Sequence, residues 1–100
     1  MSTPIAFITG ATSGIGKATA IRFAKDGYRL ILAARRTERL DTLKSTIQTE
    51  QQTEVLTLTL DIQNNSAVTQ AIDNLSDEWK HINVLVNNAG TAITTDSIHE

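Results

Sequence analysis

The sequence of 100 residues contains no cysteine, one proline and few aromatic residues, which make up 4% of the chain. Without cysteine, the chain can form neither disulfides nor thiolate metal sites, and no cysteine can serve as a nucleophile. No cluster of residues has the spacing of metal ligands, so we expect no metal site. The absence of cysteine is compatible with a reducing compartment, and we expect a cytoplasmic protein.

A strong excess of one charge is also missing. Nine basic and eleven acidic residues give a formal net charge of −2, which supplies no broad positive field for nucleic acid. The longest apolar run, residues 30–34, is far shorter than the roughly 20 residues that a membrane-spanning helix needs. The first residues also lack the pattern of a signal peptide. We therefore expect neither a nucleic-acid partner nor a membrane partner.

The pattern that is present alternates between short apolar stretches and amphipathic segments. Residues 5–9, 29–34, 55–60 and 82–87 are predicted strands, and residues 55–60 show one apolar face that we expect to be well buried. Helices are predicted over about 14–26 and 37–49, the second with Thr37 as N-cap. Strands that alternate with helices predict an α/β fold with a doubly wound parallel sheet and helices on both faces.

The expected inward faces of the helices follow from their periodicity. The first helix is expected to bury an apolar stripe, and a single third helix is expected to bury another. For the third helix, Asn64, Asn65 and Ser66 are the candidate N-caps. The two stripes are Ile15, Ala18, Ile21 and Ala24, widened by Ala20 and Phe23, and then Val68, Ala71, Ile72, Leu75 and Trp79.

A glycine-rich stretch, residues 9–16, joins the first strand to the first helix with the spacing Gly-x-x-x-Gly-x-Gly. A helix N-terminus offers free N–H groups and a positive dipole end, which suit a phosphate. Gly10 would permit a tight turn, Gly14 would let a pyrophosphate approach the backbone, and Gly16 would let the helix pack closely. The alternative is an ordinary tight turn between a strand and a helix.

The other unusual residues also follow strands, and ligands of such sheets bind at the carboxyl ends of the strands. About 20 residues beyond Gly16, where an NAD site usually carries a carboxylate, the chain has Ala34 followed by Arg35 and Arg36. Guanidinium groups pair well with a phosphate, so we expect NADP(H), with these arginines on its 2′-phosphate. Arg39 adds a third cation near the same helix N-terminus, although a solvated basic loop is the alternative.

Together these motifs resemble the short-chain dehydrogenase/reductase (SDR) family, in residues 9–16, in Asp61 after the third strand and in residues 87–90, Asn-Asn-Ala-Gly. Residues 34–40 are also similar to the NADP-dependent branch that oxidises serine and other 3-hydroxy acids. The resemblance implies a Rossmann-type fold and an oxidoreductase that moves hydride between NADP(H) and a small alcohol or carbonyl substrate, with a 3-hydroxy acid as one candidate. It also implies a homo-oligomer, a dimer or tetramer.

The resemblance assigns cofactor-binding roles residue by residue. Asp61 would bond the adenine amino group, although it could instead cap the next helix. Asn87 would help tie the sheet together, although Asn87 and Asn88 could simply form a turn. The implied cofactor-binding residues are Gly10, Ala11, Thr12, Ser13, Gly14 and Ile15 at the pyrophosphate and adenosine, Arg35 and Arg36 at the 2′-phosphate, Asp61 and Ile62 at the adenine, and Asn88, Ala89 and Gly90 beside the ribose and nicotinamide.

The catalytic residues of that family are not found in this sequence. The family uses a serine, a tyrosine and a lysine four residues after the tyrosine, but Tyr28 is the only tyrosine and Leu32 stands four residues later. We therefore expect residues 1–100 to be the N-terminal part of a single NADP-binding domain whose remainder and catalytic residues lie beyond residue 100. The alternatives are a non-catalytic NADP(H) sensor or scaffold and, with less support, an α/β signalling domain.

Overall fold

The computed structural model describes residues 3–88 of the chain. In this part, four strands form one parallel sheet in the order β3-β2-β1-β4. The strands are β1 (Ile5–Thr9), β2 (Arg29–Ala34), β3 (Val55–Thr59) and β4 (Val84–Asn87). The helices between them are α1 (Gly14–Lys25), α2 (Thr37–Gln51), α3 (Asn65–Asp73) and α4 (Asp77–Lys80). The predicted α/β architecture, a Rossmann-type doubly wound parallel sheet, is confirmed.

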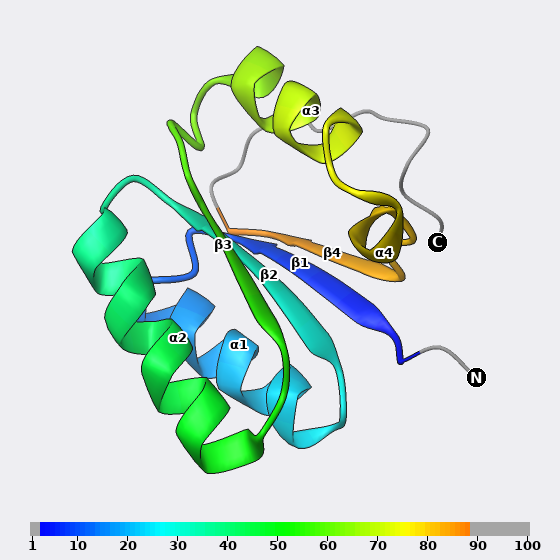
Figure 1. Ribbon diagram of the computed structural model, residues 1–100. Coiled ribbons are helices and arrows are strands. Elements are labelled where there is room, and N and C mark those ends of the chain that lie inside the picture. The colour runs from blue at the N-terminus through cyan, green and yellow to red at the C-terminus, as the bar shows by residue number, and fades with distance from the viewer. Residues whose placement is uncertain (1–2, 89–100) are drawn as a thin grey trace.

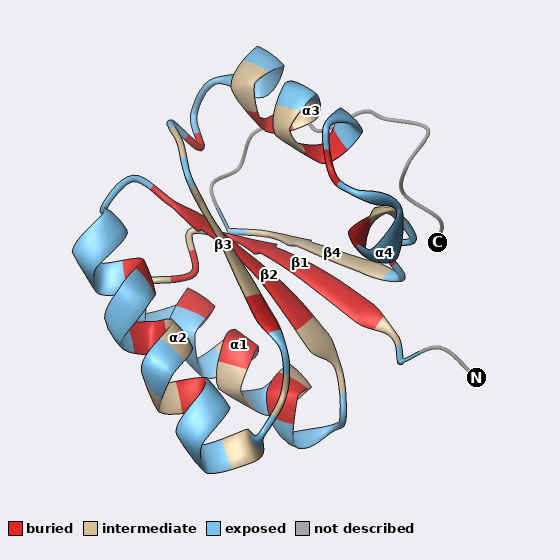
Figure 2. Cartoon of the chain, in the orientation of Figure 1, coloured by how far each residue is buried: buried red, intermediate tan, exposed pale blue. Residues whose placement is uncertain are grey.

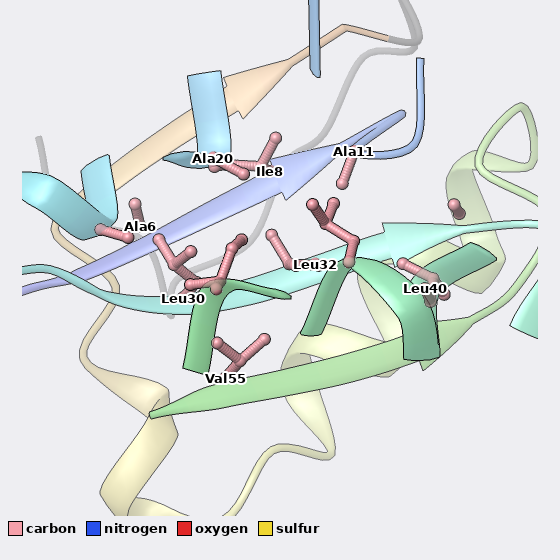
Figure 3. Packing of buried hydrophobic residues seen from close by; sticks show 12 residues of the cluster. Ala6, Ile8, Ala11, Ala20, Leu30, Leu32, Leu40 and Val55 are labelled. Atoms are coloured by element: carbon pink, nitrogen blue, oxygen red, sulfur yellow. The ribbon is translucent and has the colours of Figure 1, made fainter. Parts of the chain in front are cut away.

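Helices cover both faces of the sheet, as predicted: α1 and α2 lie on one face, and α3 and α4 on the other (Figure 1). Successive side chains of a strand point to opposite faces, so neighbouring residues of β1 enter different cores. Ala6 and Ile8 pack towards α1 and α2 (Figure 3), whereas Ile5 and Phe7 pack towards α3 and α4. The sheet is therefore the shared wall of two hydrophobic cores.

The central strands β1 and β2 are buried almost throughout (Figure 2), whereas β3 at one side of the described sheet is not. β3 ends at Thr59, one residue earlier than expected. The expected well-buried face is also wrong, because Leu56, Leu58 and Leu60 are only half-buried. An edge strand has a neighbouring strand on one side only, which leaves its side chains less covered.

The buried face of α1 differs from the expected stripe. Ala20 and Ala24 are buried as expected, and Gly16 joins them. Ile15 and Ala18, in contrast, are exposed. These three buried positions are four residues apart, and small residues there let α1 lie close against the sheet. Spacing alone did not distinguish this stripe of small residues from the adjacent one that contains the larger side chains.

The predicted third helix is in fact two helices, α3 and α4. Asn64 is the N-cap of α3, because its Oδ1 accepts a hydrogen bond from the Ala67 N–H at 3.1 Å. α3 ends at Asp73, with Asn74 as its C-cap, and Ser76 has the extended backbone of a new N-cap. The expected burial is confirmed for Val68, Ile72, Leu75 and Trp79, which share one core, whereas Ala71 is only half-buried. The break therefore redirects the chain without displacing its apolar stripe.

Two further boundaries differ slightly. β4 begins at Val84, because Ile82 forms only an isolated bridge. α2 continues to Gln51, beyond the expected end. Among residues 3–88, no helix combines the length and apolar character needed to cross a bilayer.

Candidate functional site

The loop after β1 forms a tight turn that holds the start of α1. Gly10 has a φ of +63°, a backbone conformation that side chains with a Cβ rarely adopt. The Ser13 hydroxyl donates to the Gly10 carbonyl at 2.8 Å and accepts from the Gly16 N–H at 3.1 Å. Ser13 is therefore both the N-cap of α1 and the brace of the turn, and the predicted role of Gly10 in the turn is confirmed.

The two later glycines of the loop lie in contrasting surroundings. A Cβ on Gly16 would lie 2.0 Å from the Gly10 carbonyl oxygen, so the first turn of α1 can pack against the loop only without a side chain there. A Cβ on Gly14 would meet nothing within 4 Å. Packing among the described residues thus accounts for Gly16 but not for Gly14. An open approach to the backbone at Gly14 is what a pyrophosphate would need.

The ends of β1 and β4 are joined by side chains. The buried Thr9 hydroxyl donates to Asn87 Oδ1 at 2.9 Å, and Asn88 Nδ2 donates to the Thr9 carbonyl at 3.1 Å. The Asn88 Cβ also lies 3.3 Å from where a Cβ of Gly10 would stand. These contacts fix the glycine turn against the end of β4.

At the start of α2, the expected N-cap is wrong. The helix already includes Thr37, and the N-cap position is held by Arg36, which makes no side-chain capping bond. A guanidinium has no acceptor atom, so it cannot cap the free N–H groups of the first turn. The Thr37 hydroxyl instead forms a hydrogen bond with the Thr59 hydroxyl at 2.9 Å. Within residues 3–88, the N-cap side chain of α2 therefore accepts no bond from the first turn, where Glu38 is the acidic residue.

Three guanidinium groups gather at this helix end. Arg35, Arg36 and Arg39 are exposed, and within residues 3–88 their side chains form no ion pair or hydrogen bond. Cations at the positive end of a helix dipole are unfavourable by about 0.3–1 kcal/mol each. An anion bound among them would reverse that penalty.

The glycine turn and the arginines face one groove of about 290 Å³. A second hollow of about 380 Å³ lies beside it, since both are lined by Thr12 and Arg39. The second hollow also includes Lys17 from α1 and Glu38 from α2. The first groove is lined by Gly10, Thr12, Ser13, Ala34, Arg35, Arg36, Arg39 and Ile62.

Asp61 and Ile62 follow β3, and Ile62 lines this groove. The Asp61 carboxylate accepts the Gln63 N–H at 3.0 Å, which holds the exposed side chain in place. The alternative that Asp61 caps the next helix is wrong, because Asn64 does so. Ile62 is 8% exposed and reaches towards Gly10.

The structure thus brings six of the predicted cofactor residues into one groove: Gly10, Thr12, Ser13, Arg35, Arg36 and Ile62. Ala11 is buried in the core, whereas Ile15 is 75% exposed at the start of α1. Ala89 and Gly90 lie outside the described residues. Arg39, which lies in the first turn of α2, also lines the groove and was missing from the predicted site, although the sequence places it in the same basic cluster as Arg35 and Arg36.

For metal ions, no group of three or more potential ligands occurs in the described part of the chain.

A parallel sheet with a glycine-rich turn and an arginine cluster at its carboxyl edge defines a nucleotide-binding protein of the Rossmann class. The family model described as short chain dehydrogenase matches residues 4–100. The chain therefore belongs to the short-chain dehydrogenase family.

Individual relatives agree with this assignment. The chain is 41% identical over 96 residues to an NADP-dependent 3-hydroxy acid dehydrogenase of Salmonella typhi, covering 96% of this chain and 37% of the relative. It is 46% identical over 89 residues to sulfoacetaldehyde reductase 2 of Chromohalobacter salexigens, covering 89% and 34% respectively. The structure of L-sorbose reductase from Gluconobacter frateurii with NADPH and L-sorbose matches with a TM-score of 0.81 at 34% identity, covering 90% of this chain and 34% of that one. The chain thus spans little more than a third of the length of these proteins.

Proposed function

We propose that this chain is the coenzyme-binding part of an NADP-dependent oxidoreductase that moves a hydride between NADP(H) and a small alcohol or carbonyl substrate. The observation that carries the proposal is the uncapped start of α2, where Arg35, Arg36 and Arg39 face the groove beside the glycine turn. A carboxylate at the end of β2, as in NAD sites, would instead repel the 2′-phosphate.

The residues present fit this coenzyme. The N-terminus of α1 and the open backbone at Gly14 would receive the pyrophosphate, with Ala11, Thr12 and Ser13 along the turn. Arg35 and Arg36 would hold the 2′-phosphate. Ile15 would lie with the turn at the pyrophosphate and adenosine, Asp61 and Ile62 would take the adenine, and residues 88–90 would lie beside the ribose and nicotinamide.

The coenzyme would supply the hydride chemistry, and these residues would bind and orient it. We place the catalytic serine, tyrosine and lysine in further sequence of the same domain, because the relatives are nearly three times as long as the matched segment. A 3-hydroxy acid is the proposed substrate, following the name of the Salmonella relative. A non-catalytic sensor is not favoured, since the relatives are named as dehydrogenases and reductases.

A homodimer or homotetramer is part of the proposal, following the family resemblance. A cytoplasmic location remains a prediction from the sequence.

Coenzyme titrations of the full-length protein test the cofactor assignment. Charge-assisted hydrogen bonds contribute about 1.5–3 kcal/mol each, so replacing Arg35 or Arg36 by Gln should raise the Kd for NADPH roughly 10- to 100-fold. The Kd for NADH should stay within about twofold, since NADH lacks the 2′-phosphate. Arg22→Gln, on the last turn of α1, is the matched control and should change neither Kd. An equal loss of affinity for NADPH and NADH would contradict the 2′-phosphate assignment.

A turnover assay tests the reaction itself. The full-length protein is supplied with NADP⁺ and L-serine or 3-hydroxybutyrate, and NADPH formation is followed at its absorbance band. NADPH binding without any turnover over a panel of small hydroxy acids, ketones and sugars would favour the sensor.

A further inference from the structure

The arginine-bearing turn between β2 and α2 is attached at both ends to the same point of β3. On one side, Ala34 is the register partner of Thr59, and its carbonyl accepts the Leu60 N–H at 3.0 Å. On the other side, the hydroxyl of Thr37, the first residue of α2, lies 2.9 Å from the Thr59 hydroxyl. The turn that carries Arg35 and Arg36 is therefore held between two contacts with the end of β3.

This double attachment matters because the guanidinium groups are not held by side-chain partners. Within the described residues, the side chains of Arg35 and Arg36 form no hydrogen bond or ion pair that would orient them. Their placement follows from the backbone of the turn, which the Ala34 pairing fixes at one end and the threonine pair fixes at the other. Without the threonine bond, the first turn of α2 would lose its side-chain hydrogen bond to β3 and would be held there by packing alone.

The same threonine is adjacent to the adenine end of the groove. β3 ends at Thr59, and Asp61 and Ile62 follow within three residues. The threonine pair thus links the segment proposed for the 2′-phosphate to the segment proposed for the adenine. The pair would thereby set the spacing between the two segments proposed to recognise one ligand.

We propose that Thr37 and Thr59 are positioning residues that set the preference for NADPH over NADH by holding the arginine turn in register with β3. This inference rests on the proposed function, since it requires that the arginines contact the 2′-phosphate. The threonines act through the turn, so their effect falls on NADPH and not on NADH.

The experiment measures Kd for NADPH and NADH, and thermal unfolding, in the full-length protein. The variants are Thr37→Val, Thr59→Val, the double variant and Thr37→Ser, which keeps the hydroxyl. Thr46→Val is the matched control, because the Thr46 hydroxyl donates to the Thr42 carbonyl within α2. Because the lost bond is a neutral hydrogen bond at an exposed position, each single Val variant should raise the Kd for NADPH roughly two- to tenfold and leave the Kd for NADH unchanged.

Three further results are expected. The double variant should bind NADPH about as tightly as the more affected single variant, because both substitutions remove the same hydrogen bond. Thr37→Ser should recover most of the NADPH affinity, and Thr46→Val should leave the NADPH-to-NADH ratio unchanged.

Two outcomes would overturn the inference. If wild-type protein prefers NADPH and the Val variants keep that preference, the threonine pair has no positioning role, while the proposed function stands. If wild-type protein binds both coenzymes equally, the 2′-phosphate assignment fails and the positioning role fails with it.

Discussion

Adding one methyl group at Gly16 should lower the free energy of unfolding, whereas adding one at Gly14 should not. In Gly16→Ala, the new Cβ would lie 2.0 Å from the Gly10 carbonyl oxygen, 2.8 Å from the Gly10 carbonyl carbon and 3.0 Å from the Ala11 Cα. These are backbone atoms of a braced turn, so they cannot rotate away. In Gly14→Ala, the new methyl would meet nothing within 4 Å.

The magnitudes follow from these surroundings. Overpacking typically costs 1–3 kcal/mol, and a rigid obstacle places Gly16→Ala at about 3 kcal/mol. Replacing glycine by alanine inside a helix returns about 1 kcal/mol, which leaves a net loss of about 2 kcal/mol. Gly14→Ala should be neutral to stabilising, by less than about 1 kcal/mol, because it lies at the first position of the helix.

Coenzyme affinity, in contrast to stability, should be lowered by the substitution at Gly14. If a pyrophosphate approaches the backbone at Gly14, a methyl group there displaces it, and Kd should rise at least roughly tenfold, or about 1.4 kcal/mol. NADH and NADPH should be affected alike, because both contain the pyrophosphate. This common loss distinguishes Gly14→Ala from substitutions at the arginines, which should affect NADPH alone.

Urea unfolding without coenzyme, followed by titration of both coenzymes, tests the pair of variants in the full-length protein. A constant m value would show that midpoints can be compared directly. A Gly16→Ala variant that unfolds at the wild-type midpoint would refute the packing argument. A Gly14→Ala variant that binds both coenzymes normally would refute the pyrophosphate assignment.

Two further substitutions test other parts of the structure. Arg39→Gln should raise the Kd for NADPH roughly three- to tenfold and leave the Kd for NADH unchanged. The control is Lys44→Gln, which removes a cation from the same helix outside the groove and should change neither Kd. If a fluorescence titration shows equal effects of the two substitutions, Arg39 does not belong to the site. Asn83→Ala should lower the free energy of unfolding by about 1 kcal/mol, because the Ile5 N–H loses its 2.9 Å hydrogen bond to Asn83 Oδ1. Asn83→Asp keeps an acceptor and should lose less stability. Urea unfolding measures both variants, and equal losses of stability would contradict this prediction.

The strands could be predicted from sequence because their signal is strong and local. β1 and β2 begin and end where expected, since their continuous apolar runs are bounded by a proline, a glycine or charged residues. The location of the groove was also predictable, because the carboxyl ends of parallel strands share one edge of the sheet. Once the alternation of strands and helices was recognised, the glycine turn and the arginines had to lie near each other.

What could not be predicted depended on neighbours that are distant in sequence. The apolar stripe from Val68 to Trp79 has regular helical spacing, yet helix geometry breaks near Asn74 while both ends stay in one core. The buried face of α1 is the stripe that contains Gly16, and its close approach is visible only once the Gly10 turn lies beneath it. Periodicity identifies which side chains share a face, but only packing decides which face is covered.

The wrong N-cap at Thr37 is the informative case. A threonine before a helical segment normally accepts the first free N–H groups, and that rule predicts a capped α2. Instead, Thr37 bonds to Thr59, and the N-cap position falls to an arginine that has no acceptor. The first turn of α2 thereby lacks an N-cap acceptor and lies beside three cations, an unfavourable arrangement that Glu38 in the same turn offsets only in part. Natural sequences depart from local rules mainly where function requires it, and an anionic ligand would satisfy both the N–H groups and the guanidinium groups at once.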